Sequence, residues 1–325
     1  MGEIIFVRFG VKGASVSFSK ALYNLQTKDY FILSKCDEFN NQAENIMYLD
    51  RSSFFKFVFS SFRIISFLLK NSNKVVILMP SPFDWLCVFK KGGKETVSII
   101  IHDDKTHLGD NRFKESFTSS YWKIIKPNIL TLSKYVSKSL EGKGFVVGPV
   151  LFHPYFVSEE IKPVNFNERK FDFGFFGRFK SYQGVAFIEK FRNGLDSNNS
   201  ILYCGGSQPI IQSKKINETC VYGKITDEIF FNLMSQTKNI ILPYTEATQS
   251  GVIPNALKLN CQVIVTDVGG LREQDILNDF VIISLSDDSI KELNKMDKYN
   301  RPELNKSIEK ISPLNFYEKL KNSLV

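Results

Sequence analysis

The stretch NIILPYTEATQSGVIPNALKLNCQVIVTDVGGLREQ, residues 239–274, decides the fold predicted for this chain. Its runs NIILPY (239–244) and CQVIVTD (261–267) are short and apolar, which is typical of buried strands. The segment PNALKLN (254–260) between them has helical spacing. A strand, a helix and a further strand in this order indicate a parallel sheet covered by helices.

The same alternation continues on both sides of this stretch. Helix-like segments such as ASVSFSKALYNL (14–25) and DEIFFNLMSQ (227–236) separate the strand-like runs. The predicted fold class is therefore α/β, with doubly wound parallel sheets. The other runs that favour strands are EIIFVRF (3–9), YFILS (30–34), KVVILMP (74–80), TVSIIIHD (96–103), NILTLS (128–133), FDFGFFG (171–177), SILYCGG (200–206) and FVIIS (280–284).

The length of 325 residues suits two domains of about 150 residues each. The alternation breaks at residues 147–170, where prolines and charged residues favour an exposed linker. We therefore expect Rossmann-like domains at 1–155 and 156–325. The last segment, PLNFYEKLKNSLV (313–325), has its apolar residues near one helical face, and we expect it to pack back on the first domain.

Composition indicates a globular protein, because 43% of the residues are hydrophobic and 23% are charged. The segment MGEIIFVRFG at residues 1–10 has neither the basic start nor the apolar stretch of a signal peptide. The five cysteines are scattered and form no CxxC pair, so neither a disulfide framework nor a zinc site is predicted. The expected location is the cytoplasm.

The net charge of +8 comes entirely from residues 1–155, which carry 21 Lys and Arg against 13 Asp and Glu. Residues 156–325 carry 21 of each sign. A basic half predicts a polyanionic partner such as nucleic acid, a phosphorylated acceptor or an anionic membrane surface. The aromatic residues follow core spacing instead of alternating with cations, so no nucleic-acid partner is expected.

The segment RSSFFKFVFSSFRIISFLLK, residues 51–70, bears on the membrane alternative. It places Lys56, Arg63 and Lys70 seven residues apart, hence on one helical face, among Phe and Ile. Such a helix could lie in a membrane interface, which would make the protein peripheral on the inner face of the membrane. The alternative is a mostly buried helix of the first domain.

In open parallel sheets, ligands bind beyond the carboxyl ends of the strands. Arg178 and Lys180 follow the strand at 171–177, where they could clamp diphosphate oxygens. Ser250 and Gly251 open the helix after the strand at 239–244, which favours an anion site at its first amides. A surface turn is the alternative for Arg178 and Lys180.

Two carboxylates lie in the same turns. Glu246 could accept hydrogen bonds from sugar hydroxyls, or could simply be an acidic residue that the helix dipole favours. Glu273 follows Gly269 and Gly270, which allow the chain to approach a ligand closely, and could bind a ribose or sugar hydroxyl. A plain turn is the alternative there.

The first half offers the loop GVKGAS (10–15) and the pair His102-Asp103 at the end of a predicted strand. Gly10, Gly13 and Ser15 do not form GxGxxG, so a dinucleotide fingerprint is not supported. A lone His is more often structural, but at a strand end His102 becomes a candidate site residue.

The segments FGFFGRFKSYQG (173–184), YCGG (203–206) and YGKITDEIFFNLMS (222–235), followed by residues 240–274, together carry a resemblance. The series resembles the C-terminal domain of the family 4 retaining glycosyltransferases of the GT-B fold, strongly over about 171–275 and loosely before it. The resemblance implies two Rossmann-like domains that face a central cleft. It also implies transfer of a sugar from a nucleotide diphosphate with retention of configuration.

The resemblance assigns diphosphate binding to Arg178 and to a Lys. The family's usual Lys precedes a Gly, where this chain has Gln183-Gly184, and Lys180 is favoured as its replacement. Glu246 fits the first of two family glutamates, and Asn255 or its neighbour stands in place of the second. The turn resembles the SGV-type variant, in which the backbone amides that face the donor are those of Ser250, Gly251, Val252 and Ile253.

In similar enzymes a His at the position of His102 contacts the transferred sugar, and Asp103 could orient its ring. The predicted catalytic set is therefore His102, Arg178, Lys180 and Glu246. The predicted donor-binding set is Gly13, Ser250, Gly251, Val252, Ile253, Asn255 and Glu273. No strand end carries a DxD motif, so metal independence is expected, and no cofactor is expected because the nucleotide sugar is a substrate.

The predicted function is transfer from a UDP- or GDP-sugar to a hydroxyl of a glycan or lipid-linked oligosaccharide, in the synthesis of a surface polysaccharide such as lipopolysaccharide or capsule. One alternative is a nucleotide-sugar epimerase of similar fold, with His102 and Glu246 as acid and base. The other is a non-catalytic partner subunit, suggested by the missing second Glu and the Lys-to-Gln change.

Overall fold

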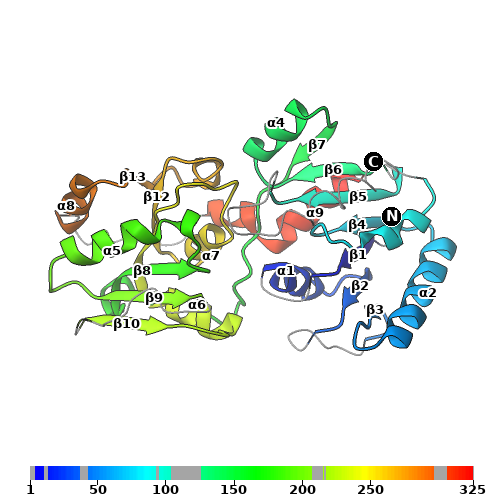
Figure 1. Cartoon of the computed structure of the whole chain (residues 1–325), viewed down its shortest axis with the longest axis horizontal. Helices are drawn as coiled ribbons and strands as arrows, with labels where there is room; N and C mark the ends of the chain where they lie inside the picture. The colour runs from blue at the N-terminus through cyan, green and yellow to red at the C-terminus, as the bar shows by residue number, and fades with distance from the viewer. Residues whose placement is uncertain are drawn as a thin grey trace. The chain divides into compact units, whose positions relative to one another are not determined.

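The computed structural model describes residues 4–10, 14–36, 43–92, 95–103, 126–206, 215, 217–295 and 306–324. These residues form two compact units (Figure 1). The first unit holds the described residues up to Phe152 together with those from Pro313 onward. The second holds the described residues from His153 to Ser312.

The first unit is built on a parallel sheet of seven strands in the order β3-β2-β1-β4-β5-β6-β7. The order reverses between β1 and β4, as in a doubly wound sheet. Its strands are β1 (Ile4–Arg8), β2 (Tyr30–Ser34), β3 (Ile46–Leu49), β4 (Lys74–Ile77), β5 (Val97–Ile101), β6 (Asn128–Thr131) and β7 (Val147–Val150). The described helices of this unit are α1 (Ala14–Tyr23), α2 (Phe54–Lys70), the 3₁₀ helix η1 (Asp84–Phe89), α4 (Lys134–Gly142) and α9 (Pro313–Ser323).

The second unit repeats this order with six parallel strands, β10-β9-β8-β11-β12-β13. Its strands are β8 (Phe171–Gly177), β9 (Ile201–Gly205), β10 (Glu218–Val221), β11 (Thr237–Leu242), β12 (Gln262–Thr266) and β13 (Val281–Ile283). Its described helices are α5 (Val185–Gly194), α6 (Asp227–Ser235), α7 (Val252–Lys258) and α8 (Asp287–Lys295), with 3₁₀ helices at Phe166–Glu168, Ser181–Gln183, Arg272–Gln274 and Lys306–Ile311. The two sheets confirm the predicted α/β class.

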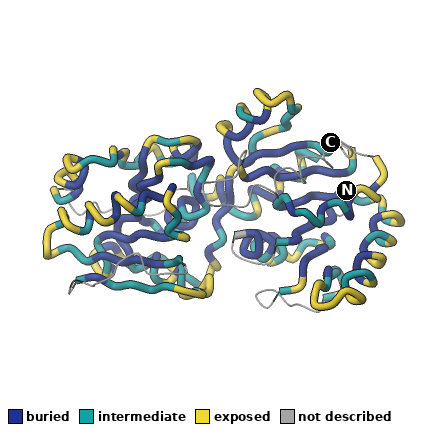
Figure 2. The backbone as a smooth tube through the Cα atoms, in the orientation of Figure 1, coloured by how far each residue is buried: buried dark blue, intermediate teal, exposed yellow. Residues whose placement is uncertain are grey.

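Burial explains why the strands are continuous apolar runs. Every residue of β1, β11 and β12 is buried, because helices cover both faces of a parallel sheet. Figure 2 shows the strands of each unit as buried segments, with exposed residues on the outer helices and turns. Each unit therefore has a hydrophobic core of its own.

The C-terminal helix α9 belongs to the first unit. Phe316 of α9 is 2% exposed, and its ring lies edge-on to that of Phe18 of α1 at 5.1 Å between centroids. Tyr317 lies 6.3 Å from Phe6 of β1. The chain thus returns to its first sheet after the whole second unit.

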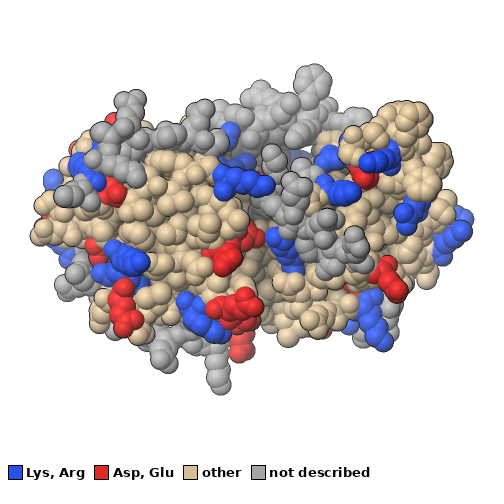
Figure 3. All heavy atoms as spheres, turned by 90° about the horizontal axis from the view of Figure 1, so that it is seen from below, with Lys and Arg blue, Asp and Glu red and all other residues tan. Residues whose placement is uncertain are grey.

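Charged side chains do not form one continuous area on the face drawn in Figure 3, where Lys and Arg lie in small groups, several of them beside Asp or Glu. Of the helices in the described part of the chain, none is both long enough and apolar enough to cross a bilayer.

Candidate functional site

The candidate site lies in the turns that follow β8, β11 and β12. These strands are neighbours in the second sheet, so their carboxyl ends meet at one edge. Hydrogen bonds and close backbone contacts tie the three turns to one another. The sheet order therefore brings together segments that are far apart in the sequence.

Arg178 follows directly after β8 and is exposed. Its Nη2 donates a hydrogen bond to the Tyr182 hydroxyl at 2.8 Å. The Tyr182 carbonyl in turn accepts from the Thr245 amide at 2.8 Å and from the Thr245 hydroxyl at 3.2 Å. Tyr182 thus holds the guanidinium and joins the turn after β8 to the turn after β11.

Gln183 makes a second link between these turns. Its Oε1 accepts from the Lys180 amide at 3.1 Å, and its Nε2 donates to the Tyr244 hydroxyl at 3.1 Å. The side chain is buried, so a Lys here would bring a charge into the interior. The position where the resemblance expects Lys holds an amide with a structural role, and Lys180 is half-exposed beside Arg178.

Tyr244 lies beneath this edge. Burial raises the pKa of Tyr244, and its hydrogen bonds with Ser250 and Gln183 act in the opposite direction without cancelling the effect. The phenol is therefore neutral at physiological pH, and its hydroxyl connects two turns through hydrogen bonds with Gln183 and Ser250.

Glu246 lies half-buried between the two contacts that fix the turn after β11. On one side Thr245 is bonded to Tyr182. On the other side Ala247 lies so close to Gly269 that a Cβ at position 269 would overlap the Ala247 carbonyl, and Gly269 has φ +55°. The glycines after β12 were predicted to let the chain approach a ligand, and the structure shows Gly269 approaching the neighbouring turn.

Ser250 is held by a reciprocal pair of hydrogen bonds with Gln274. The Ser250 amide donates to Gln274 Oε1 at 2.7 Å, and Gln274 Nε2 donates to the Ser250 carbonyl at 3.0 Å. The Val252 amide donates to Ser250 Oγ at 3.3 Å. Of the four amides predicted to face a donor, those of Ser250 and Val252 are thus bonded within the chain, while Gly251 is half-exposed and Ile253 is buried.

Asn255 is buried, and both ends of its amide are used within the second unit. Its Nδ2 donates to the Gly251 carbonyl at 2.6 Å, and its Oδ1 accepts from the Phe156 amide at 2.6 Å. The residue therefore fixes the start of α7. Glu273 is half-exposed next to Gln274, at the same edge of the sheet.

His153 reaches the same point from the segment that enters the second unit. It is buried, and a Cβ at Gly251 would lie 3.5 Å from its Nε2. Its Nδ1 lies 2.8 Å from the Pro154 carbonyl, which as a pure acceptor requires a proton on Nδ1. In the neutral ring Nε2 is then an acceptor beside Gly251.

His102 lies in the first unit, directly after β5, and is buried. Its Nε2 donates to the Leu78 carbonyl at 3.0 Å, and its ring lies edge-on to Phe18 at 5.7 Å. Burial lowers the pKa of His102, although Asp103 and the Leu78 carbonyl partly offset the shift. The ring is therefore mainly neutral at pH 7, with the proton on Nε2 bonded to Leu78.

The remaining predicted positions lie in the loop at residues 10–15. Gly10 lies against Ser15, whose Oγ would be 2.6 Å from a Cβ at position 10. Gly13 lies outside the described residues. Across the described ranges, no group of His, Cys, Asp and Glu is arranged to hold a metal ion.

Sequence reasoning missed Tyr182, Tyr244, Gln274 and His153, and it gave Gln183 no structural role. Each connects segments distant in sequence, and a Tyr or Gln near a strand end carries no local signal of such a contact. Only the position of each strand end could have pointed to them.

Comparison with known proteins gives no sequence family: no family model matches the chain, and no curated protein matches it. Solved structures match well. HepE from Anabaena, in complex with UDP and glucose, has a TM-score of 0.71 at 8% identity and covers 99% of both chains. Sucrose-phosphate synthase from Thermosynechococcus elongatus has a TM-score of 0.69 at 12% identity, with 99% of this chain and 98% of that chain covered.

WaaG, a glycosyltransferase involved in lipopolysaccharide biosynthesis, has a TM-score of 0.57 at 11% identity and covers 90% of each chain. At such low identities the similarity shows the fold, and the roles of individual residues cannot be transferred. The two doubly wound parallel sheets agree with this similarity over nearly the full chain. The chain therefore has the GT-B fold.

Proposed function

We propose that this protein is a glycosyltransferase that moves a sugar from a UDP- or GDP-sugar to a hydroxyl of a glycan or lipid-linked oligosaccharide. The observation that carries the proposal is the set of three cross-linked turns at the carboxyl edge of the second sheet. They place Arg178, Glu246, Gly251 and Glu273 at one edge. The same fold in HepE, solved with UDP and glucose, supports a nucleotide-sugar donor.

In this proposal Arg178 and Lys180 bind the donor diphosphate and stabilise the charge that builds on it as the sugar leaves. Fixed cationic donors act most strongly where charge develops in the transition state. The Tyr182 hydroxyl restricts the guanidinium in advance, which lowers the cost of ordering it around a ligand. The Gly251 and Ile253 amides supply further donors, and those of Ser250 and Val252 would have to change partners.

Glu246 and Glu273 accept hydrogen bonds from sugar or ribose hydroxyls in this scheme. His102, neutral with Nε2 bonded to Leu78, contacts the transferred sugar as a positioning group and not as a base. The leaving phosphate takes the acceptor's proton, the configuration is retained, and no metal is required. The resemblance of residues 171–275 supports retention, and the basic first half supports a phosphorylated, lipid-linked acceptor.

Substitution of Arg178 by Ala tests the site. Loss of a charge-assisted contact to a phosphate costs about 1.5–3 kcal/mol, so UDP or GDP should bind about tenfold more weakly or worse. Calorimetric titration measures the affinity and a radiolabelled donor measures transfer. Lys190→Ala, an exposed cation on α5 of the same unit, is the matched control and should change neither. Normal turnover of Arg178→Ala would remove this residue from the site.

Two rival functions give different results. An epimerase would convert the nucleotide sugar without any acceptor, which product analysis by chromatography detects. A non-catalytic partner subunit would bind no nucleotide sugar in a thermal-shift screen. Transfer that depends on an added acceptor excludes both.

A further inference from the structure

The helix α2 of the first unit has two different apolar faces. One face packs on β3 and η1 and buries Ser60, Ser61, Ile64 and Leu68. The other is exposed: Phe55 is 83% exposed, Phe59 67%, Phe62 68% and Leu69 49%. These positions follow one another at spacings of four, three and seven residues, so they form one row along the helix. Figure 2 shows the exposed side of this helix.

A helix that only packs on its own domain buries its largest apolar side chains, and α2 leaves several of them exposed. Two serines lie in the buried face, whereas phenylalanines point into solvent. Removing a Phe side chain from water is favourable, so covering a row of exposed Phe residues stabilises the covered state. Contiguous apolar surface of this kind marks an interaction site. Phe55, Phe59, Phe62 and Leu69 together form the α2 apolar row.

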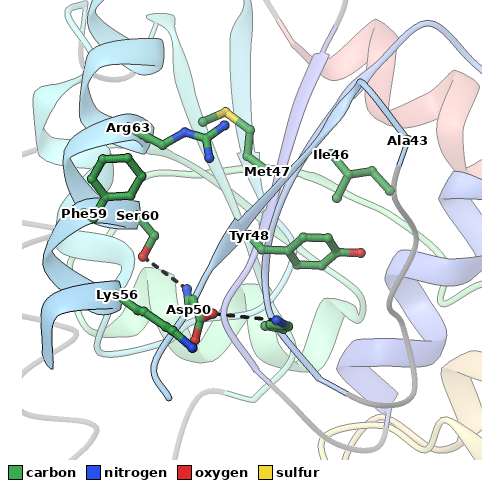
Figure 4. Close-up of a pocket in the computed structure, with 10 residues that line it drawn as sticks. Ala43, Ile46, Met47, Tyr48, Asp50, Lys56, Phe59, Ser60 and Arg63 are labelled. Carbon is green, nitrogen blue, oxygen red and sulfur yellow. Dashed lines mark hydrogen bonds and ion pairs between the residues drawn. The ribbon is translucent and has the colours of Figure 1, made fainter. Parts of the chain in front are cut away.

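Cations line one side of the α2 apolar row. Lys56, Arg63 and Lys70 recur every seven residues, and α2 itself contains no Asp or Glu. Lys56 and Arg63, with Phe59 between them, border a hollow of about 450 Å³ between α2 and β3 (Figure 4). Arg63 and Lys70 border a second hollow of about 440 Å³ further along the helix.

The first hollow is positive overall despite one carboxylate. Lys35, Lys56 and Arg63 face it together with Asp50. Hydrogen bonds from Ser52 hold the pKa of Asp50 below its usual range, and Lys35 and Lys56 act in the same direction, so Asp50 is ionised. Lys35 pairs with Asp50 at 3.7 Å, which leaves Lys56 and Arg63 as the excess cations. Such a hollow suits a phosphate group.

We propose that α2 lies in the interface of an anionic phospholipid bilayer, with the α2 apolar row among the acyl chains. Lys56, Arg63 and Lys70 then contact lipid phosphates above the two hollows. The helix lies on the membrane and does not cross it. This surface does not depend on the proposed transferase activity.

A second copy of the chain fits this surface less well. A two-fold interface places the same patch on both subunits, so six cations would share one interface to which α2 brings no carboxylate. An anionic bilayer instead matches both the apolar row and the charge. Self-association through α2 without binding to vesicles would therefore overturn the proposal.

The test is flotation of the full chain with vesicles of phosphatidylcholine alone or with about a third phosphatidylglycerol. Binding should be at least about tenfold stronger to the anionic vesicles and should fall with added salt, since each cation near the surface contributes to attraction. Equal binding to both vesicles, or none to either, contradicts the proposal.

Two triple variants separate the apolar and charged contributions. Phe55→Ser with Phe59→Ser and Phe62→Ser, and Lys56→Glu with Arg63→Glu and Lys70→Glu, should each reduce binding to anionic vesicles about tenfold or more. The control Lys134→Glu with Lys138→Glu and Lys143→Glu changes the charge equally at exposed positions on and just after α4. It should stay within about threefold of the parent.

Val146→Ser, at a position 91% exposed in the same unit, is the matched apolar control and should bind as the parent does. Circular dichroism checks folding, and the single variants Phe59→Ser and Arg63→Glu replace any triple variant that fails to fold. Unchanged vesicle binding in the α2 variants, or loss of self-association alone in light scattering, would show that α2 does not bind lipid.

Discussion

Gly184 marks a point where the second unit accepts no side chain. It has φ +74°, and a Cβ here would overlap the carbonyl oxygen of Pro243. The contact presses the turn after β8 against the turn after β11, and Gln183 bonds Tyr244 across the same junction. The Gln183-Gly184 pair, which departs from the family's Lys-Gly, is thus explained by packing between the two turns next to Arg178.

Gly184→Ala should therefore cost far more stability than left-handed backbone strain alone. Strain of this kind costs about 1–3 kcal/mol, and the backbone overlap should bring the loss above about 3 kcal/mol. Gly223→Ala is the control, because Gly223 also has positive φ, at +98°, but a Cβ there meets nothing within 4 Å. Urea unfolding measures both, and equal losses would refute the packing explanation.

His102 should make the first unit less stable in mild acid. Burial lowers the pKa of His102 below 6.5, so below that pH the unfolded chain binds a proton that the folded chain does not. The free energy of unfolding is then unaffected by this group above pH 6.5 and falls by up to about 1.4 kcal/mol per pH unit beneath it. His102→Gln should remove this part of the slope in denaturant titrations at pH 7.5, 6.5 and 5.5, and an unchanged slope would contradict the assignment.

At the scale of elements, α9 and α2 differ in what their apolar residues touch. The aromatic residues of α9 pack on α1 and β1, so they stabilise the fold. Those of the α2 apolar row are exposed to solvent, so we expect their removal to destabilise the fold little. Apolar spacing alone does not distinguish these cases.

Phe316→Ala in α9 should destabilise the first unit by about 3–5 kcal/mol, the usual cost of deleting a buried aromatic ring. Leu314→Ala is the control, because Leu314 lies on the same helix and is 57% exposed. It should cost less than about 0.5 kcal/mol. Hydrogen exchange in β1 and α1 reports the first unit, and similar effects of both substitutions would deny α9 this role.

The strands could be predicted because a parallel sheet buries both faces, which leaves continuous runs such as Ile4–Arg8 and Gln262–Thr266. The position of Arg178 followed from the end of β8. The links from Tyr182 to Thr245 and from Ser250 to Gln274 could not be predicted, because they depend on sheet order and side-chain direction. The sequence of residues 51–70 is compatible with an interfacial helix or a buried helix, whereas α2 has one buried and one exposed face.

On the scale of the whole molecule, the candidate donor residues after β8, β11 and β12 belong to the second unit, and His102 belongs to the first. In sequence, the second unit is inserted between two parts of the first, because the first unit holds both β1 and α9. Each unit has its own sheet and its own core, so effects of a ligand can be assigned to one or the other.

Addition of UDP should slow amide exchange mainly in residues 177–184, 243–253 and 267–275. These segments form the cross-linked turns where the proposal places the nucleotide, and ligand binding protects the state that it stabilises. Hydrogen exchange with mass spectrometry measures this, with α4 as an internal reference expected to change little. Protection confined to residues outside 153–312 would move the donor site elsewhere.

The return of the chain to its first sheet sets an order for folding during synthesis. The surface of α1 that Phe316 covers emerges from the ribosome early, whereas α9 is made only after the entire second unit. At about 5–20 residues per second, the delay between α1 and α9 is on the order of fifteen to sixty seconds. The second unit can thus finish folding while the first still lacks its last helix, and during that interval Phe6 and Phe18 are a natural target for chaperones.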